Sequence, residues 1–166
     1  SNDADDYVQQ SKEYLYNKEF YTDKGRVIFP ILYAGLLGIF KLDIYTVQIL
    51  ITILCSLVTF TCSLIIKKNY GFTYATLFSF LSVDFFHENI GGVCTENIGY
   101  ILGGISFIYF HNFLNLSKKS LYYYSLSMLF LFIGYIIRPS IIFILPAIIF
   151  FSLIYINKLS KYDVIK

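Results

Sequence analysis

Two groups of carboxylates and two arginines are the side chains that could do chemistry in an otherwise apolar chain. One group lies within residues 3–23, and the other lies in the stretch Asp84–Leu102, which reads DFFHENIGGVCTENIGYIL. Carboxylates can accept a proton from a hydroxyl or hold a cation, and arginine binds phosphate through its fork of N–H donors. The elements that position these groups decide whether they can act together.

The composition indicates that lipid is the solvent of most of the chain. Of the 166 residues, 57% are hydrophobic and 14% are charged, whereas soluble domains carry about 25% charged residues. A single soluble core of this length could not cover so much apolar surface. The sequence has no initiator methionine and no signal-peptide pattern. We therefore interpret it as part of a longer membrane protein, with at least one span before Ser1 and more after Lys166.

The apolar runs predict an all-α fold, a polytopic transmembrane helical bundle with about five spans. A membrane helix needs about 20 apolar residues, with about 17 as the lower limit. The segments expected to cross are Ile44–Ile66, Gly71–Phe86, Ile98–Leu114, Leu121–Ile137 and Pro139–Ile156. Residues 1–43 are predicted to form an extracytoplasmic loop with interfacial helices, and residues 44–166 to form the bundle.

The segment Val27–Phe40 is predicted to lie at the interface or to be re-entrant. Its 14 residues would reach about 21 Å as a helix, short of the hydrocarbon core of about 30 Å. Gly35 and Gly38 would let this helix pack closely on a neighbour. In the same way, Gly99 and Gly103 form a G-x-x-x-G pattern that predicts close packing of their span on a partner helix.

The charges are segregated in a way that supports five crossings. The segments 67–70, 115–120 and 157–166 would share one side, which carries seven lysines and one acid, a net charge of +6. The acidic segments and Arg138 would share the other side, with a net charge of −4. Short lysine-rich loops stay in the cytoplasm, so the acids are expected to face outward. A crossing by residues 27–40 would break this segregation.

Four short motifs, in order, resemble the GT-C superfamily of multi-span glycosyltransferases, which use polyprenyl-phosphate-linked sugars. This superfamily includes the protein O-mannosyltransferases and the lipid A aminoarabinose transferase. The opening NDADDYVQQSKEYLYNKEF, followed by RVIFPILYAGLLGIFKLD, is similar to its first outer loop. The matching residues are Asp3-Ala4 with Tyr7, Arg26 with Pro30, Thr95-Glu96, and Arg138-Pro139. The sequence departs from the family at Val27-Ile28-Phe29, where a second proline is usual, and it lacks the first span and the C-terminal half.

The resemblance implies roles for these residues in moving a sugar from a polyprenyl-phosphate donor to an acceptor. Asp3 would be the general base or would position the acceptor, and Glu96 would contact the sugar, the acceptor or a divalent ion. Arg138 and Arg26 would bind the lipid phosphate, and Tyr7 would help to bind substrate. The acceptor would be a glycan, a lipid or a protein, and no nucleic acid is expected. No cofactor is certain, and a divalent cation is left open because the family varies in its metal dependence.

Each of these residues also has a structural interpretation. Acids near a helix start suit its dipole, and Asp3 precedes a helical pattern expected over Tyr7–Phe20. Glu96 could be a solvated loop acid, and Arg138 could extend along the apolar boundary to reach water. His87-Glu88 lacks the second histidine of H-E-x-x-H, so a zinc site is not expected.

The function expected from the resemblance is that of a glycosyltransferase in a bacterial inner or plasma membrane, active on its extracytoplasmic face. A transporter or flippase of lipid-linked saccharide is the first alternative, but it would need polar groups along a path through the spans. A non-catalytic assembly subunit is the second. The three cysteines imply no disulfide framework. The sequence does not indicate the sugar or the acceptor.

Overall fold

The structure is a computed structural model that describes residues 2–17, 28–41, 43–89, 92–115, 120–138 and 149. It describes the side chains of these residues except at positions 2–4, 88, 115 and 120. The elements are α1 (Asn2–Asn17), α2 (Ile28–Ile39), α3 (Ile44–Tyr70), α4 (Phe72–Asn89), α5 (Thr95–Asn115) and α6 (Ser120–Ile137). The regular structure in this part of the chain is entirely helical, which confirms the predicted all-α class.

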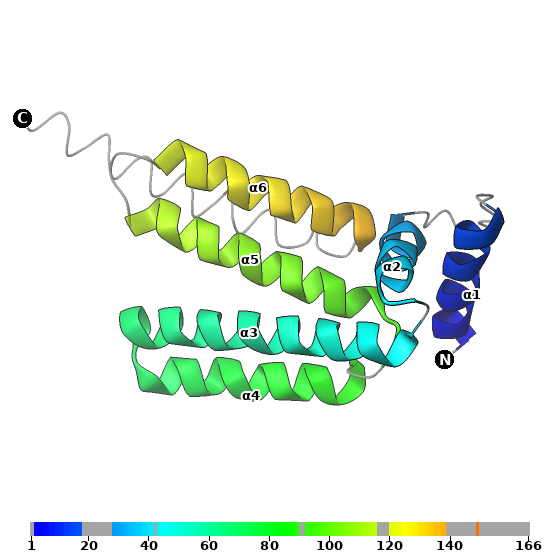
Figure 1. Ribbon diagram of the computed structural model, residues 1–166. Coiled ribbons are helices and arrows are strands. Elements are labelled where there is room, and N and C mark those ends of the chain that lie inside the picture. Colours follow the sequence, from blue (N-terminus) through cyan, green and yellow to red (C-terminus); the bar gives the residue numbers. More distant parts are fainter. Residues whose placement is uncertain are drawn as a thin grey trace, which may run out of the picture.

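Helices α3 to α6 form two antiparallel hairpins that pack side by side. Figure 1 shows the order α6, α5, α3, α4, and the contacts join α5 to α6, α3 to α4, and α3 to α5. The segment between α4 and α5 and the end of α6 therefore lie at one end of the bundle. The turn between α3 and α4 lies at the opposite end, together with the end of α5. This arrangement agrees with the predicted grouping of residues 84–97 with Arg138.

Helix α3 packs parallel to α5 along a seam with a seven-residue repeat. The Cys55 thiol donates to the carbonyl oxygen of Asn97 at 3.6 Å, and the Cys62 thiol donates to that of Gly104 at 3.7 Å. One further step along, Asn69 Nδ2 lies 3.2 Å from His111 Nε2. The same offset at three contacts, seven residues apart, shows that the two helices keep one register along their contact, as heptad packing does.

The small residue at this seam is Gly104, which is not part of the predicted G-x-x-x-G pair of Gly99 and Gly103. A Cβ added at Gly104 would overlap Val58 Cγ1 of α3, whereas a Cβ at Gly103 meets nothing within 4 Å. Successive residues point about 100° apart around a helix, so the two glycines face different neighbours. Likewise, a Cβ at Gly38 of α2 would contact Leu15 of α1 at 3.5 Å, while Gly35 faces open space.

Hydroxyl groups supply further contacts between the helices. The Tyr100 hydroxyl of α5 lies 2.8 Å from Thr59 Oγ1 of α3 and 2.9 Å from Ser82 Oγ of α4. Ser106 and Ser127 join α5 to α6, with 2.9 Å between their hydroxyl oxygens and no more than 1% of either residue exposed. Serine and threonine are favoured between membrane helices, where small side chains allow close approach and hydroxyls bond across the contact.

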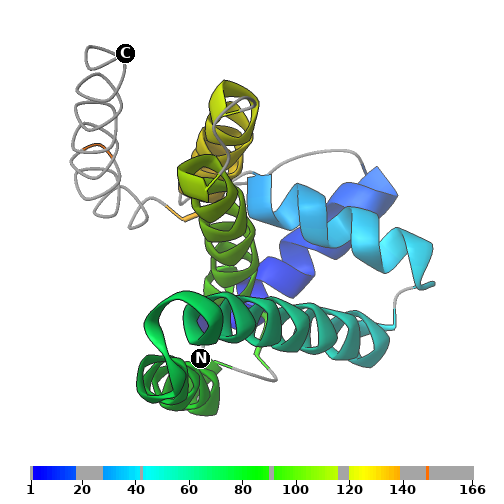
Figure 2. The ribbon, with the colours of Figure 1, turned by 90° about the vertical axis from the view of Figure 1, so that its left-hand side faces the viewer.

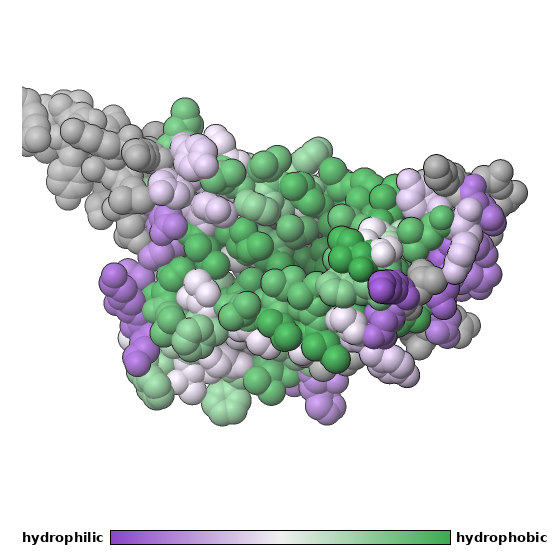
Figure 3. All heavy atoms as spheres, viewed as in Figure 1, coloured by the Kyte–Doolittle hydropathy of each residue, from purple (hydrophilic) through white to green (hydrophobic). Residues whose placement is uncertain are grey.

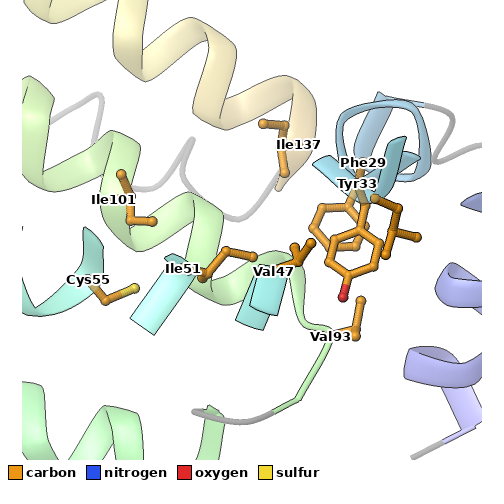
Figure 4. Packing of buried hydrophobic residues seen from close by; sticks show 9 residues of the cluster. Phe29, Tyr33, Val47, Ile51, Cys55, Val93, Ile101 and Ile137 are labelled. Carbon is orange, nitrogen blue, oxygen red and sulfur yellow. The ribbon is translucent and has the colours of Figure 1, made fainter. Parts of the chain in front are cut away.

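Helices α1 and α2 pack on each other and lie beyond one end of the bundle (Figures 1 and 2). Phe29, Tyr33 and Leu37 of α2 are each at most 2% exposed. Figure 4 shows Phe29 and Tyr33 beside Val47 of α3 and Val93. Helix α2 runs across the bundle end and not alongside α3 (Figure 1).

The surface carries many large apolar side chains between two polar ends. Figure 3 shows hydrophobic residues over the middle of the bundle and hydrophilic residues around α1 and at the opposite end. On α3, Ile49, Leu57 and Phe60 are 56–63% exposed. Helix α3 is the one helix in the described ranges that is long and apolar enough to cross a membrane, and α2 and the segment Leu121–Ile137 are apolar but shorter.

Several helix boundaries differ from the predicted ones. Helix α1 (Asn2–Asn17) begins before the predicted Tyr7, so Asp5 and Asp6 lie inside the helix and do not precede it. The predicted end at Phe20 lies outside the described residues. Acids in early turns interact favourably with the helix dipole, which accounts for the earlier start. Helix α5 begins at Thr95, three residues before the predicted span, and thus includes Glu96 in its first turn. The predicted span Pro139–Ile156 lies outside the described residues, apart from position 149.

The Asp43 carboxylate caps the start of α3, and the stability that this cap contributes depends on pH. Its carboxylate accepts from the Tyr45 backbone N–H at 3.1 Å and from the Thr46 hydroxyl, and the bond from Thr46 is the main reason why the pKa of Asp43 lies below its usual value. A lowered pKa stabilises the folded state above the usual pKa of an aspartate, and this contribution is lost as the pH falls through the lowered value. We expect thermal unfolding of the Asp43→Asn variant to approach that of the wild type in acid, because asparagine also caps helices. An unfolding difference that stays constant with pH would contradict this.

Candidate functional site

The best-defined polar cluster joins the start of α5 to the end of α6. Arg138 Nη1 donates to Glu96 Oε1 in an ion pair and to Thr95 Oγ1 at 3.1 Å. The Thr95 hydroxyl donates in turn to Glu96 Oε2 at 3.1 Å. The side chains of Arg138 and Glu96 are 35% and 26% exposed, so the cluster is half-buried and remains open to solvent.

The helix ends explain why these residues meet. Glu96 lies in the first turn of α5, where the dipole favours an anion, and Arg138 follows the last residue of α6, where it favours a cation. The backbone N–H of Arg138 donates to the Gly134 carbonyl at 2.7 Å, which holds the residue against the end of the helix. Because α5 and α6 are antiparallel, these two ends lie side by side.

The pairing leaves part of the arginine available to a ligand. Nη1 makes both contacts, and Nη2 and Nε of Arg138 have no partner among the described residues. A guanidinium with free donors can bind an oxyanion such as a phosphate. The neighbouring carboxylate could contact a hydroxyl of the same ligand. The cluster therefore combines an anion-binding group with a proton acceptor.

Asn97 organises the segment that leads into this cluster. The residue is 3% exposed, and its Nδ2 donates to the Asn89 carbonyl at 3.0 Å and to the Gly92 carbonyl at 3.4 Å. These bonds tie the end of α4 and residue 92 to the first turn of α5. Sequence reasoning missed Asn97. A usable signal was present, because Glu-Asn-Ile-Gly occurs twice, at 88–91 and 96–99, and the two asparagines are the residues that meet.

Cys94 immediately precedes Thr95 of the cluster, and its surroundings favour the protonated thiol. It is half-buried, and burial together with the nearby Glu96 carboxylate raises its pKa. The nucleophilic form of a cysteine is the thiolate, so this environment does not suit covalent catalysis. All three cysteines of the chain are free.

The structure brings together only part of the predicted site. Arg138 and Glu96 are in contact, with Thr95 between them. Tyr7 packs its ring against Phe29 of α2, with 4.9 Å between ring centroids, and so serves the contact between α1 and α2. The backbone of Asp3 lies in the first turn of α1, but its side chain is outside the described set, and Arg26 lies outside the described residues.

The described side chains offer no ready metal site. No group of three or more histidine, cysteine, aspartate or glutamate residues in the described ranges is arranged to hold a metal ion. Glu96 is held by Arg138, which competes with a cation for its oxygens.

No protein-family model matches the chain, and no curated protein and no solved structure matches it.

Proposed function

We propose that this chain is part of an integral membrane glycosyltransferase that moves a sugar from a polyprenyl-phosphate donor to an acceptor on the extracytoplasmic face. The observation that carries the proposal is the contact between Glu96 and Arg138 at one end of the bundle. It combines a phosphate-binding group with a carboxylate at the water boundary. The GT-C resemblance supports it, because both residues fall on its motifs.

The transfer would use the cluster in a simple way. Free donors of Arg138 would bind the donor phosphate and stabilise the charge that develops as it leaves. The acceptor oxygen would bond to the anomeric carbon, and the bond from that carbon to the phosphate oxygen would break with its electron pair. A carboxylate, Glu96 or Asp3, would take the proton of the acceptor hydroxyl. A phosphate on Arg138 would also compete with Glu96 and so release the carboxylate.

The membrane placement is part of the proposal. Helix α3 would cross the bilayer, and α4, α5 and α6 would cross beside it with a fifth span after Arg138. The apolar band between the polar ends (Figure 3) supports this placement. Lys67 and Lys68 in the last turn of α3 would face the cytoplasm. The membrane would be a bacterial inner or plasma membrane.

A transporter or flippase of lipid-linked saccharide is the second candidate. The hydroxyls of Thr59, Ser82 and Tyr100 between α3, α4 and α5 favour it, because a path through a membrane needs polar groups in the spans. These hydroxyls satisfy one another and carry no charge, so they serve equally well as contacts between the helices. An assembly subunit without activity is the third candidate.

A reconstituted assay separates these candidates. The full-length protein in liposomes would be given a radiolabelled polyprenyl-phosphate sugar, and transfer of label to an acceptor would be measured beside movement of the donor across the bilayer. An enzyme gives transfer with no net movement. Movement without transfer would favour the transporter, and neither activity would favour the assembly subunit.

Cysteine labelling in intact cells tests the membrane placement. His87 near the end of α4 and Lys68 in the last turn of α3 are both exposed. In a Cys94→Ala background that keeps the buried Cys55 and Cys62, we expect His87→Cys to react with a membrane-impermeant maleimide. Lys68→Cys should react only after the membrane is permeabilised. Equal labelling of both variants in intact cells would contradict the proposed topology.

A further inference from the structure

A small polar cavity lies where α2, the start of α3 and residues 92–97 meet. Its volume is about 10 Å³, and five polar residues line it: Tyr33, Gln48, Thr52, Cys94 and Asn97. No charged side chain in the described ranges lines it. A volume of this size holds about one water molecule. The cavity is thus too small for a sugar and has no carboxylate for a cation.

Two of the residues that line this cavity each carry a buried polar atom with no partner in the described part of the chain. The Tyr33 hydroxyl and the Asn97 Oδ1 atom have no hydrogen-bond partner among the described residues, and the two residues are 1% and 3% exposed. Figure 4 shows the Tyr33 hydroxyl pointing from α2 toward the segment that carries Val93. Buried polar groups are nearly always hydrogen-bonded in folded proteins, so two orphaned atoms at one cavity indicate a missing partner.

The chemistry of the two atoms fits one water molecule. Burial raises the pKa of the Tyr33 hydroxyl, and a polar interaction with the Gln48 side chain, whose geometry is too poor for a hydrogen bond, offsets part of this rise. The phenol therefore stays protonated and can donate. Asn97 Oδ1 is a carbonyl oxygen and can only accept. The bonds from the Asn97 amide nitrogen to the Asn89 and Gly92 carbonyls fix the orientation of this amide. A water that accepts from Tyr33 and donates to Asn97 satisfies both, and Gln48 and Thr52 offer further partners.

We infer that this cavity is a binding site for a single water molecule that bridges the Tyr33 hydroxyl and Asn97 Oδ1. The water joins α2 to the first turn of α5, one residue after Glu96. Asn97 then holds three parts of the chain together: the end of α4, residue 92 and, through the water, α2. This inference does not depend on the proposed glycosyltransferase activity.

The sign of a stability change tests the inference. If the hydroxyl is bridged, Tyr33→Phe removes a hydrogen bond and leaves the water with one partner fewer, so we expect Tm of the full-length protein in detergent to fall by about 2–4 °C. If the hydroxyl is unpartnered, the same change removes a buried polar group at no loss, and Tm rises or stays constant. Tyr45→Phe, at a residue that is 80% exposed, is the matched control and should leave Tm unchanged.

The same change made in a Gln48→Leu variant tests whether Tyr33 bonds Gln48 directly. The effect of Tyr33→Phe should persist in Gln48→Leu, because the water still bridges to Asn97. Loss of the effect in that background would show that Tyr33 bonds Gln48 directly and would overturn the inference. A rise or no change in Tm in the wild-type background would overturn it as well.

A high-resolution structure in lipid nanodiscs should place oxygen-sized density within hydrogen-bonding distance of both atoms, and clear absence of that density would also overturn it.

Discussion

Replacing Glu96 with glutamine is expected to lower sugar transfer by about 10²–10⁴-fold, the usual contribution of a positioned acid or base. Glutamine keeps the shape of the side chain and can still accept a bond from Arg138, so the fold should be retained. The expected loss would therefore report the missing carboxylate. The measurement is the initial rate of transfer in liposomes, with Tm as the control for folding. Asp3→Asn is the companion variant for the other proposed base.

The reciprocal exchange of the two charges decides whether the ion pair is functional or only structural. Glu96→Arg alone places two cations side by side and should lower Tm, and Arg138→Glu added to it should restore part of the loss. Recovery should be incomplete, because the exchanged charges oppose the dipoles of α5 and α6 at about 0.3–1 kcal/mol each. Transfer should not recover. Recovery of transfer in the exchanged protein would show that the pair acts only as a tie between the helices.

The sequence was sufficient to predict the helical class and the position of most helices. Apolar runs bounded by polar segments predicted α3 to α6 to within four residues at each end. The difference that matters for the site is the start of α5, which lies at Thr95 and not at the predicted Ile98 and so brings Glu96 into the helix. Composition alone cannot place that boundary, and the dipole and the contact with Arg138 decide it.

The spacing of apolar residues in the sequence could not predict which distant segments are in contact. The pairing of Glu96 with Arg138 could be expected only from the predicted topology, which put both on one side. The seam of Cys55, Cys62 and Asn69 with α5 has a seven-residue spacing that is visible in the sequence. Its register, however, depends on which faces meet. The G-x-x-x-G pattern indicated Gly99 and Gly103, whereas the glycine that lies against α3 is Gly104.

Alanine at each of the two neighbouring glycines of α5 is therefore expected to change Tm in opposite directions. Alanine favours a helix over glycine by about 0.5–1 kcal/mol. Gly103→Ala gains this at no cost, because its Cβ meets nothing within 4 Å, and Tm should rise. The Cβ of Gly104→Ala overlaps Val58 Cγ1, and overpacking of this kind costs about 1–3 kcal/mol, so Tm should fall. Thermal unfolding of the full-length protein in detergent measures both.

Removal of the overlapping Val58 Cγ1 atom should restore the stability that Gly104→Ala loses. Val58→Ala deletes Cγ1, and the Val58 Cβ that remains lies 3.6 Å from the added methyl group, an ordinary contact. The double variant should therefore be more stable than the sum of the two single changes predicts, which is the mark of residues in direct contact. If both glycines instead gained equally from alanine, and Val58→Ala acted independently, α3 and α5 would not meet at this seam. The register of α3 on α5 between Asn97 and His111 would then be contradicted as well.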